Sequence, residues 1–250
     1  MRNSPITKTL PLTASALALI GAASVAQAEV TGNVGVVSQY IFRGGAEDGR
    51  TALQGGLDYA HDSGFYAGTW FSTLDYGGAV DDIKPDTNNE IDLYGGYSGA
   101  AGAFGYDVGL LYFYYTGEGP TANDANVPEG YAGLSYGPVG LSANVALDDA
   151  SWTAAGDTYL NLSFEQPLPN NFTFAANAGY YFYADDTVLD NDTVVTAKTQ
   201  DSAFRDATIS VSHPLANTGA DVSFNYTFGG EFRDESEIDD HFWAGATFSF

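Results

Sequence analysis

The last ten residues of the chain, 241–250, alternate strictly between two kinds of side chain. One parity holds Phe242, Ala244, Ala246, Phe248 and Phe250, and the other holds His, Trp, Gly, Thr and Ser. A period of two is typical of a β-strand whose two faces meet different surroundings. A chain that ends on Phe-Ser-Phe favours a strand with lipid on one face and a polar lumen on the other. This end of the chain therefore predicts a transmembrane β-barrel.

The start of the chain has the pattern of an export signal. Arg2 and Lys8 give a positive start, and a mostly apolar stretch over residues 10–26 follows them. Residues 26–28 read Ala-Gln-Ala, which fits the small-x-small cleavage rule. We therefore predict a secretory signal peptide over residues 1–28 and one domain over residues 29–250. The alternative is a retained anchor, which the Thr, Ser and Pro within the apolar stretch disfavour.

Composition narrows the class of protein further. The chain has 32 Asp and Glu against 8 Lys and Arg, for a net charge of −24, which argues against nucleic acid and anionic head groups as partners. It has no Cys, so disulfides do not hold the exported fold. No segment after the signal reaches the ~18 uninterrupted apolar residues of a spanning helix. The abundance of Gly, Tyr and Phe then favours an all-β membrane barrel.

Alternating runs separated by turn residues predict twelve strands in an antiparallel, up-and-down transmembrane barrel. They cover residues 30–43, 52–60, 65–76, 89–98, 104–115, 129–136, 141–148, 157–165, 171–183, 203–212, 220–228 and 240–250. Five connections are short and carry Gly, Pro and Asn, whereas six are longer or more acidic. Short turns on one side and long loops on the other predict a bacterial outer-membrane barrel with both termini in the periplasm.

Two neighbouring segments resemble a known family. Residues 32–44 read GNVGVVSQYIFRG, and residues 52–70 read ALQGGLDYAHDSGFYAGTW. They resemble the TorF family of proteobacterial outer-membrane porins, in which an opening strand ends in Tyr-x-Phe-Arg-Gly. In that family a Gln-Gly-Gly-x-Asp-Tyr strand and then Ser-Gly-Phe-Tyr-Ala-Gly follow. The resemblance is dense over the first third of the mature chain, returns in the last strand, and implies an outer-membrane barrel and a pore.

The last strand also resembles the C-terminal assembly signal of bacterial outer-membrane barrels. That signal has a terminal aromatic residue, here Phe250, and apolar or aromatic residues at every second place before it. The resemblance implies that the barrel-assembly machinery recognises this strand and that outer-membrane lipids surround the barrel. The sequence leaves the oligomeric state open.

Strand parity places a set of charged side chains on the inner wall. They are Arg43, Asp58, Asp92, Asp107, Glu165 and Asp221. Parity also predicts that Tyr40 and Phe42 face lipid, which leaves Arg43 nearly alone as an inward base. A lone Arg among carboxylates predicts either a constriction that selects ions or a buried network that braces the barrel. The inward excess of acid predicts a cation preference if the pore is open.

The function predicted from these patterns is passive diffusion of small hydrophilic solutes. One alternative is a closed structural barrel whose acidic loops bind ions or a partner, and another is a lipid-modifying enzyme with a Ser–His pair on the outer wall. We expect no catalytic residues, because His61 and His213 fall in turns, His241 has inward parity, and no Gly-x-Ser-x-Gly motif occurs. We expect no metal or cofactor, because the chain lacks Cys/His clusters, an EF-hand loop and a Walker pattern.

Overall fold

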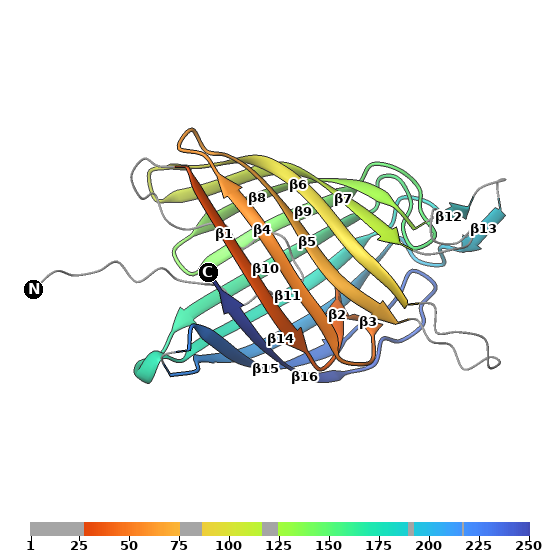
Figure 1. The fold of residues 1–250 in the computed structure, drawn as a ribbon. Helices are drawn as coiled ribbons and strands as arrows, with labels where there is room; N and C mark the ends of the chain where they lie inside the picture. Colours follow the sequence, from red (N-terminus) through yellow and green to blue (C-terminus); the bar gives the residue numbers. More distant parts are fainter. Residues whose placement is uncertain (1–27, 76–86, 117–124, 190–192, 217) are drawn as a thin grey trace, which may run out of the picture.

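The computed structural model describes residues 28–75, 87–116, 125–189, 193–216 and 218–250. These residues form a closed antiparallel β-barrel (Figure 1). The wall runs in the order β1-β16-β15-β14-β11-β10-β9-β8-β7-β6-β5-β4, so that the first and last strands pair and close the ring. This confirms the predicted all-β barrel of twelve strands. The expected signal peptide, residues 1–28, lies outside the described residues except for Ala28.

The wall strands are β1 (Glu29–Val37), β4 (Ala52–Ala60), β5 (Phe65–Asp75), β6 (Thr87–Ala101), β7 (Phe104–Thr116), β8 (Val127–Tyr136), β9 (Val139–Ala146), β10 (Thr158–Pro167), β11 (Thr173–Phe182), β14 (Ser202–Pro214), β15 (Ala220–Gly229) and β16 (His241–Ser249). Two small hairpins pair β2 (Tyr40–Phe42) with β3 (Gly45–Asp48) and β12 (Thr187–Leu189) with β13 (Thr193–Thr196). The helical part of the described chain is one 3-10 turn, η1 (Pro169–Asn171), and no helix in the described ranges could span a membrane.

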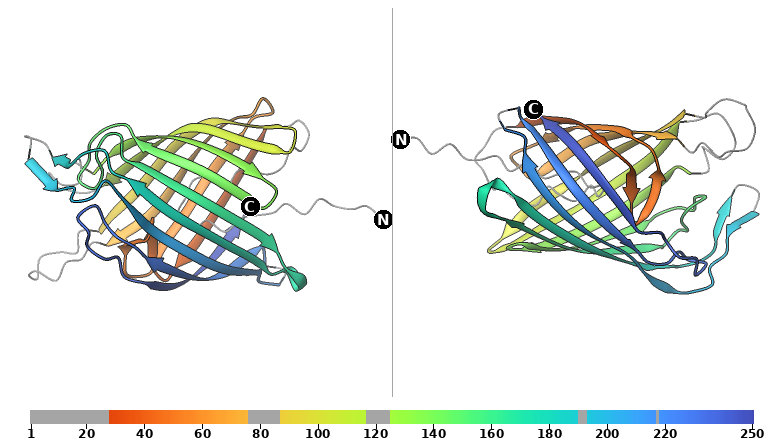
Figure 2. Two further views of the ribbon diagram at one scale, coloured as in Figure 1. Left: turned by 180° about the vertical axis from the view of Figure 1, so that it is seen from behind. Right: turned by 90° about the horizontal axis from the view of Figure 1, so that it is seen from below.

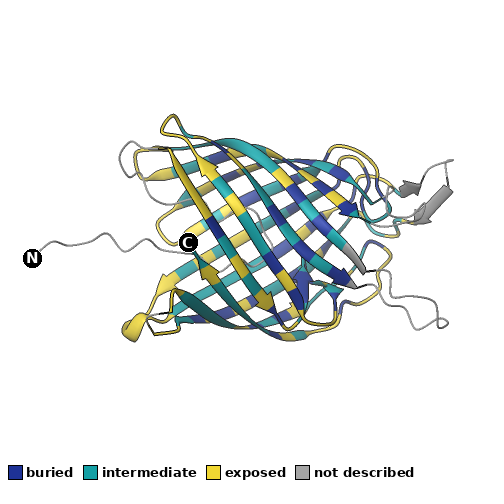
Figure 3. Ribbon diagram, viewed as in Figure 1, coloured by how far each residue is buried: buried dark blue, intermediate teal, exposed yellow. Residues whose placement is uncertain are grey.

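Side chains alternate between the two faces of the wall, as the sequence predicts. On β7, Leu111 and Phe113 are buried, whereas Leu110 and Tyr112 between and beside them are exposed. The same alternation recurs from strand to strand (Figure 3). The exposed parity carries aliphatic and aromatic side chains, which is typical of a barrel that faces lipid.

Short and long connections separate to the two ends of the barrel. The short turns include Gly64 with a φ of 97° and Gly102 with a φ of 67°, a backbone conformation that favours glycine and permits a tight reversal. Both the start of β1 and the end of β16 lie at this short-turn end (Figure 1). The described parts of the connections that follow β11 and β15 lie at the opposite, long-loop end.

The first predicted strand, residues 30–43, is wrong beyond Val37. β1 pairs with β4 up to the Val37–Ala52 pair, and the intervening residues 38–51 leave the wall as the inner hairpin, which contains β2 and β3. Tyr40 and Phe42, which parity assigned to the lipid face, pack inside the barrel instead. A run of alternating apolar residues has the same period whether it faces lipid or a packed lumen, so the pattern alone could not separate the two.

Candidate functional site

The inner hairpin lies inside the ring of wall strands toward the long-loop end (Figure 2), and the Arg43 side chain extends from its tip to the far wall. As a sheet it is hydrogen-bonded only within itself, and it contacts seven wall strands. Its side chains join Tyr40 to Trp70 of β5 and Glu90 of β6, Phe42 to Phe113 of β7, and Arg43 to Glu129 of β8, Tyr159 of β10 and Tyr181 of β11, while the Arg43 carbonyl accepts from Arg205 of β14. The strands at the tip stand opposite β1 in the ring, so the hairpin narrows the barrel across its width.

A buried ion pair fixes the tip of the inner hairpin. Arg43 Nη1 donates to Glu129 Oε1 at 2.8 Å, and Nη2 donates to Oε2 at 2.6 Å, which makes the pair bidentate. Nη1 also donates to the Tyr181 hydroxyl at 2.7 Å. The guanidinium lies over the Tyr159 ring, 4.7 Å from its centroid. We call Arg43, Glu129 and Tyr181 the hairpin latch, since bidentate charge-assisted bonds are among the strongest polar contacts in proteins.

Aromatic packing fills one side of the inner hairpin. The Tyr40 and Trp70 rings lie 5.4 Å apart, and the Phe42 ring lies 5.7 Å from Phe113 and 6.2 Å from Trp152. The Tyr40 hydroxyl donates to Glu90 at 3.2 Å and orients this side of the hairpin on β6. The lumen between the hairpin and the β5–β7 wall is therefore closed by packed rings.

The opposite end of the lumen is more accessible. Inward residues of β10 and β11 that lie toward the short-turn end, such as Asn161, Ser163 and Asn177, are half-buried. Inward residues of the same strands near the hairpin, such as Tyr159 and Tyr181, are buried. The inner wall is therefore packed at the level of the inner hairpin and polar and more accessible toward the short-turn end, which we call the vestibule.

The predicted site residues fall into two groups. Asp92 and Asp107 are buried, and the Tyr66 hydroxyl donates to Asp107 at 2.6 Å. Asp58 is half-buried and accepts a hydrogen bond of 2.5 Å from the Tyr94 hydroxyl. Glu165 of β10 and Asp221 of β15 are half-buried near the short-turn end, away from the hairpin latch.

The structure brings only part of the predicted set together. Asp92 is near enough to Arg43 for a direct electrostatic interaction, but the ion-pair partner of Arg43 is Glu129, which the sequence analysis did not select. Glu90 and Asp206 are two further buried carboxylates on the inner wall that it missed. Strand parity could have found Glu129. Ala132 and Leu134, which are apolar, have the opposite parity in β8 and are exposed on the outer wall, so Glu129 faces inward.

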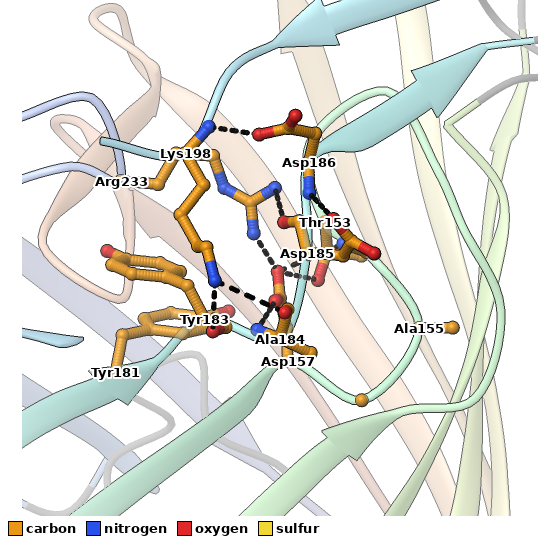
Figure 4. Close-up of polar contacts among 12 residues, drawn as sticks. Thr153, Ala155, Asp157, Tyr181, Tyr183, Ala184, Asp185, Asp186, Lys198 and Arg233 are labelled. Carbon is orange, nitrogen blue, oxygen red and sulfur yellow. Dashed lines mark hydrogen bonds and ion pairs between the residues drawn. The ribbon is translucent and has the colours of Figure 1, made fainter. Parts of the chain in front are cut away.

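A second buried ion pair lies at the long-loop end (Figure 4). Arg233 pairs with Asp157, and its Nη1 donates to the Asp185 carbonyl at 3.1 Å. Asp157 also accepts hydrogen bonds from Thr153 Oγ1 at 3.1 Å and from the Ala184 amide at 2.8 Å. These contacts tie together the connections that precede β10 and follow β11 and β15, so the outer loops support one another.

Exposed acids also stabilise the connection between β15 and β16. The Ser236 hydroxyl and amide donate to Asp234 and hold the pKa of that carboxyl below its usual range. The Gly229 amide donates to Asp240 at 2.9 Å, and the Tyr226 hydroxyl donates at 2.9 Å, which lowers the pKa of Asp240. Both carboxylates favour their charged form because backbone and hydroxyl donors point at them.

The histidine and acidic residues in the described ranges do not form a metal site: no group of three or more such side chains there is placed to hold a metal ion. His241 lies on β16 beside Phe242, which is 64% exposed, so His241 belongs to the inward parity as predicted. Residues 190–192, which read Asp-Asn-Asp, lie outside the described residues.

A closed barrel of twelve antiparallel strands, apolar outside and polar within, is the architecture of outer-membrane channels. The chain belongs to the family described as "Bacterial protein of unknown function (Gcw_chp)", whose model matches residues 21–250. The matching family does not carry the TorF name, so the resemblance is supported at the level of a porin-like barrel and not for that name. A search of curated proteins gave no significant match.

Solved structures agree on the fold. The KdgM porin is similar with a TM-score of 0.51 and 9% sequence identity, over 88% of this chain and 99% of that chain. The COG4313 outer membrane channel from Pseudomonas putida F1 is similar with a TM-score of 0.55 and 10% identity, over 90% of this chain and 96% of that chain. At this level of identity, the likeness concerns the shape of the barrel.

Proposed function

We propose that the protein is a bacterial outer-membrane channel for passive diffusion of small hydrophilic solutes. The observation that carries the proposal is a closed barrel wall with an apolar outer face and a polar, charged inner face. Lipid covers the outer face, and water and solutes occupy the inner one. In this orientation the short-turn end faces the periplasm and the long loops face the medium. The likeness in fold to two outer-membrane channels supports the proposal.

The inner hairpin is the constriction of this channel. It fills the lumen beside β5, β6 and β7 with packed rings, and its tip also reaches Arg205 and Asp206 of β14, so the passage for solutes narrows at this level. The inward side chains of β14, β15 and β16 include small polar groups, among them Ser210, Ser223 and Thr247, and the bulky Trp243. Hydroxyl groups of this kind exchange hydrogen bonds with water and neutral solutes at little energetic cost.

Charge on the inner wall gives the channel a mild preference for cations. The carboxylates on the inner wall around the packed zone and vestibule are Asp58, Glu90, Asp92, Asp107, Glu129 and Asp206. Arg43 forms an ion pair with Glu129, and the other carboxylates outnumber the bases Arg43 and Arg205 near them. In a lumen of low dielectric such an excess attracts cations and repels anions.

A closed barrel that serves as a structural element, with outer acidic loops binding ions or a partner, is the second candidate. The packing of Tyr40, Phe42 and Trp152 favours it, because bulky rings fill part of the lumen. It differs from the channel in one measurable respect: it would conduct no ions when folded.

Ion conduction by the refolded protein in a planar bilayer, with a salt gradient across the membrane, tests the proposal. Discrete current steps and a cation-selective reversal potential support it. Protein that is folded, as judged by its resistance to SDS before heating, yet gives no steps would favour the closed barrel. An anion-selective reversal potential would leave the channel but refute the role of the inner carboxylates.

A further inference from the structure

A β-bulge aims two consecutive charged side chains into the barrel. Between β11 and β14, Gly179 pairs with Asp206 and Tyr180 pairs with Phe204, so Arg205 has no partner on β11. Phe204 is exposed on the outer wall, whereas Asp206 is buried inside. Regular alternation would have sent Asp206 into lipid, but the extra residue restores its inward direction while Arg205 still reaches the inner hairpin.

The guanidinium of Arg205 is held in one orientation. Its Nε donates to the carbonyl of Arg43 at 2.7 Å. Its Cζ lies 4.3 Å from the centroid of the Phe232 ring and 5.6 Å from that of Tyr181. Two rings and one hydrogen bond fix the plane of the group, so its terminal N–H donors point in set directions.

In the described part of the chain, three other basic side chains form ion pairs with carboxylates, whereas Arg205 does not. The paired ones are Arg43 with Glu129, Lys198 with Asp201 and Arg233 with Asp157. Within the described ranges no carboxylate lies in ion-pair distance of Arg205. The adjacent Asp206 instead accepts hydrogen bonds from the Tyr159 hydroxyl at 2.9 Å and from Asn177 at 3.4 Å. Asp206 is close enough to attract Arg205 electrostatically, but it makes no ion pair with it, so the N–H donors of this half-buried cation need water or an anion as partner.

Glycine residues of the inner hairpin lie beside the terminal nitrogens of Arg205. Gly44 and Gly45 form the neighbouring part of the hairpin, and a Cβ at Gly45 would still lie 3.8 Å from Arg205 Nη2. Gly44 itself has a φ of 84°, and a Cβ there would come within 2.8 Å of the Asp206 side chain, so this close approach requires glycine. Because Phe232 belongs to the connection after β15, Arg205 lies on the long-loop side of the constriction.

We propose that Arg205 is a recognition site for the carboxylate of an organic solute that enters from the long-loop end. This inference rests on the proposed function of the barrel as a channel. A planar carboxylate matches the donor geometry of a guanidinium. The acid excess of the lumen opposes anions in general, so a solute with a carboxylate passes the constriction only where a fixed cation compensates its charge.

Block of ion current by sodium benzoate tests this site, with benzamide as the neutral probe of the same shape. Benzoate is expected to reduce the current through the wild-type channel with a saturable concentration dependence, and benzamide is not. Arg205→Gln should raise the half-blocking concentration about tenfold or more, as expected for loss of a charge-assisted hydrogen bond. Lys198→Gln removes the same charge from the long-loop end and should leave the block unchanged.

Two results of the current measurement contradict the proposal: equal block of wild type and Arg205→Gln by benzoate, or equal block by benzoate and benzamide. Arg205 also supports the hairpin tip, so calorimetric titration of benzoate into the folded protein in detergent provides a second readout that needs no current. Wild-type protein should bind benzoate measurably more tightly than the Gln variant, and equal binding contradicts the site. Absence of current steps in the wild type would refute the channel. The titration would still show whether Arg205 binds a carboxylate.

Discussion

Replacing Glu129 with Gln removes the negative partner of the hairpin latch while keeping the shape of the side chain. In the native protein Arg43 makes two bonds to Glu129, at 2.8 and 2.6 Å, and one to Tyr181. A Gln amide oxygen can accept only one of the two and carries no charge. Arg43, which is 9% exposed, would then be a buried cation held mainly by the tyrosine hydroxyl and by ring contacts.

The size of the effect follows from these bonds. A hydrogen bond to a charged group contributes about 1.5–3 kcal/mol, and a neutral one contributes about 1 kcal/mol. Exchanging two charged bonds for one weaker bond therefore destabilises the latched hairpin by about 2–5 kcal/mol. That corresponds to about a 30- to 4,000-fold change in the ratio of latched to released hairpin.

Tryptophan fluorescence reports the release directly. The chain has three Trp residues, and two of them touch the inner hairpin: Trp70 lies against Tyr40, and Trp152 lies against Phe42. Release exposes both rings to water, so the emission of Glu129→Gln should shift to longer wavelength. In single-channel recordings the variant should spend more time at a higher conductance than the wild type.

A charge-matched control separates the latch from general electrostatics. Glu237→Gln removes one acid from an exposed position in the connection between β15 and β16 and should leave both signals unchanged. The reasoning is refuted if Glu129→Gln and Arg43→Met both keep wild-type emission, conductance and resistance to heat, because the ion pair would then contribute nothing to the position of the hairpin.

Three further predictions concern the loops and the last strand. Asp157→Asn should leave Arg233 buried without its charge partner, lower the free energy of unfolding by about 3–5 kcal/mol and expose the outer loops to limited proteolysis. The pKa of Asp240 is lowered, so its bond to the Gly229 amide is fully present above the ordinary carboxyl range and is lost as pH falls through the lowered pKa. Hydrogen exchange of Gly229 should therefore keep its protection from pH 5 to 8, and Asp240→Ala should remove it. Phe250→Ala should refold normally in detergent, because the backbone bonds to Gly32 persist, but should reach the outer membrane of cells in smaller amount, as seen on heat-modifiability gels.

The barrel itself could be predicted from sequence because its signals are local. Alternation with a period of two and turns rich in glycine gave twelve strands with most boundaries within a few residues of those observed. The order of the wall then follows from hairpin connections between neighbours. The parity of β7 and β15 also placed the lipid face correctly, since each side chain there meets one of only two surroundings.

The site could be predicted only in part, because its decisive contacts are long-range. Arg43 and Glu129 are separated by 86 positions in the sequence, and no local pattern links them. The inner hairpin was missed because Tyr40 and Phe42 alternate like lipid-facing residues. The bulge at Arg205 adds one residue and shifts the parity of β14, which a period-two pattern does not reveal.

The most direct test of the account is the single-channel conductance of the wild type beside a variant in which a short turn replaces residues 38–51. The pairing of Val37 with Ala52 lets such a turn join β1 to β4 without disturbing the wall. If the inner hairpin forms the constriction, we expect discrete steps in the wild type and clearly larger steps in the variant, with the same resistance to SDS before heating. Equal conductance of the two folded proteins would contradict a constriction formed by the inner hairpin, and absence of steps in both would contradict the channel itself.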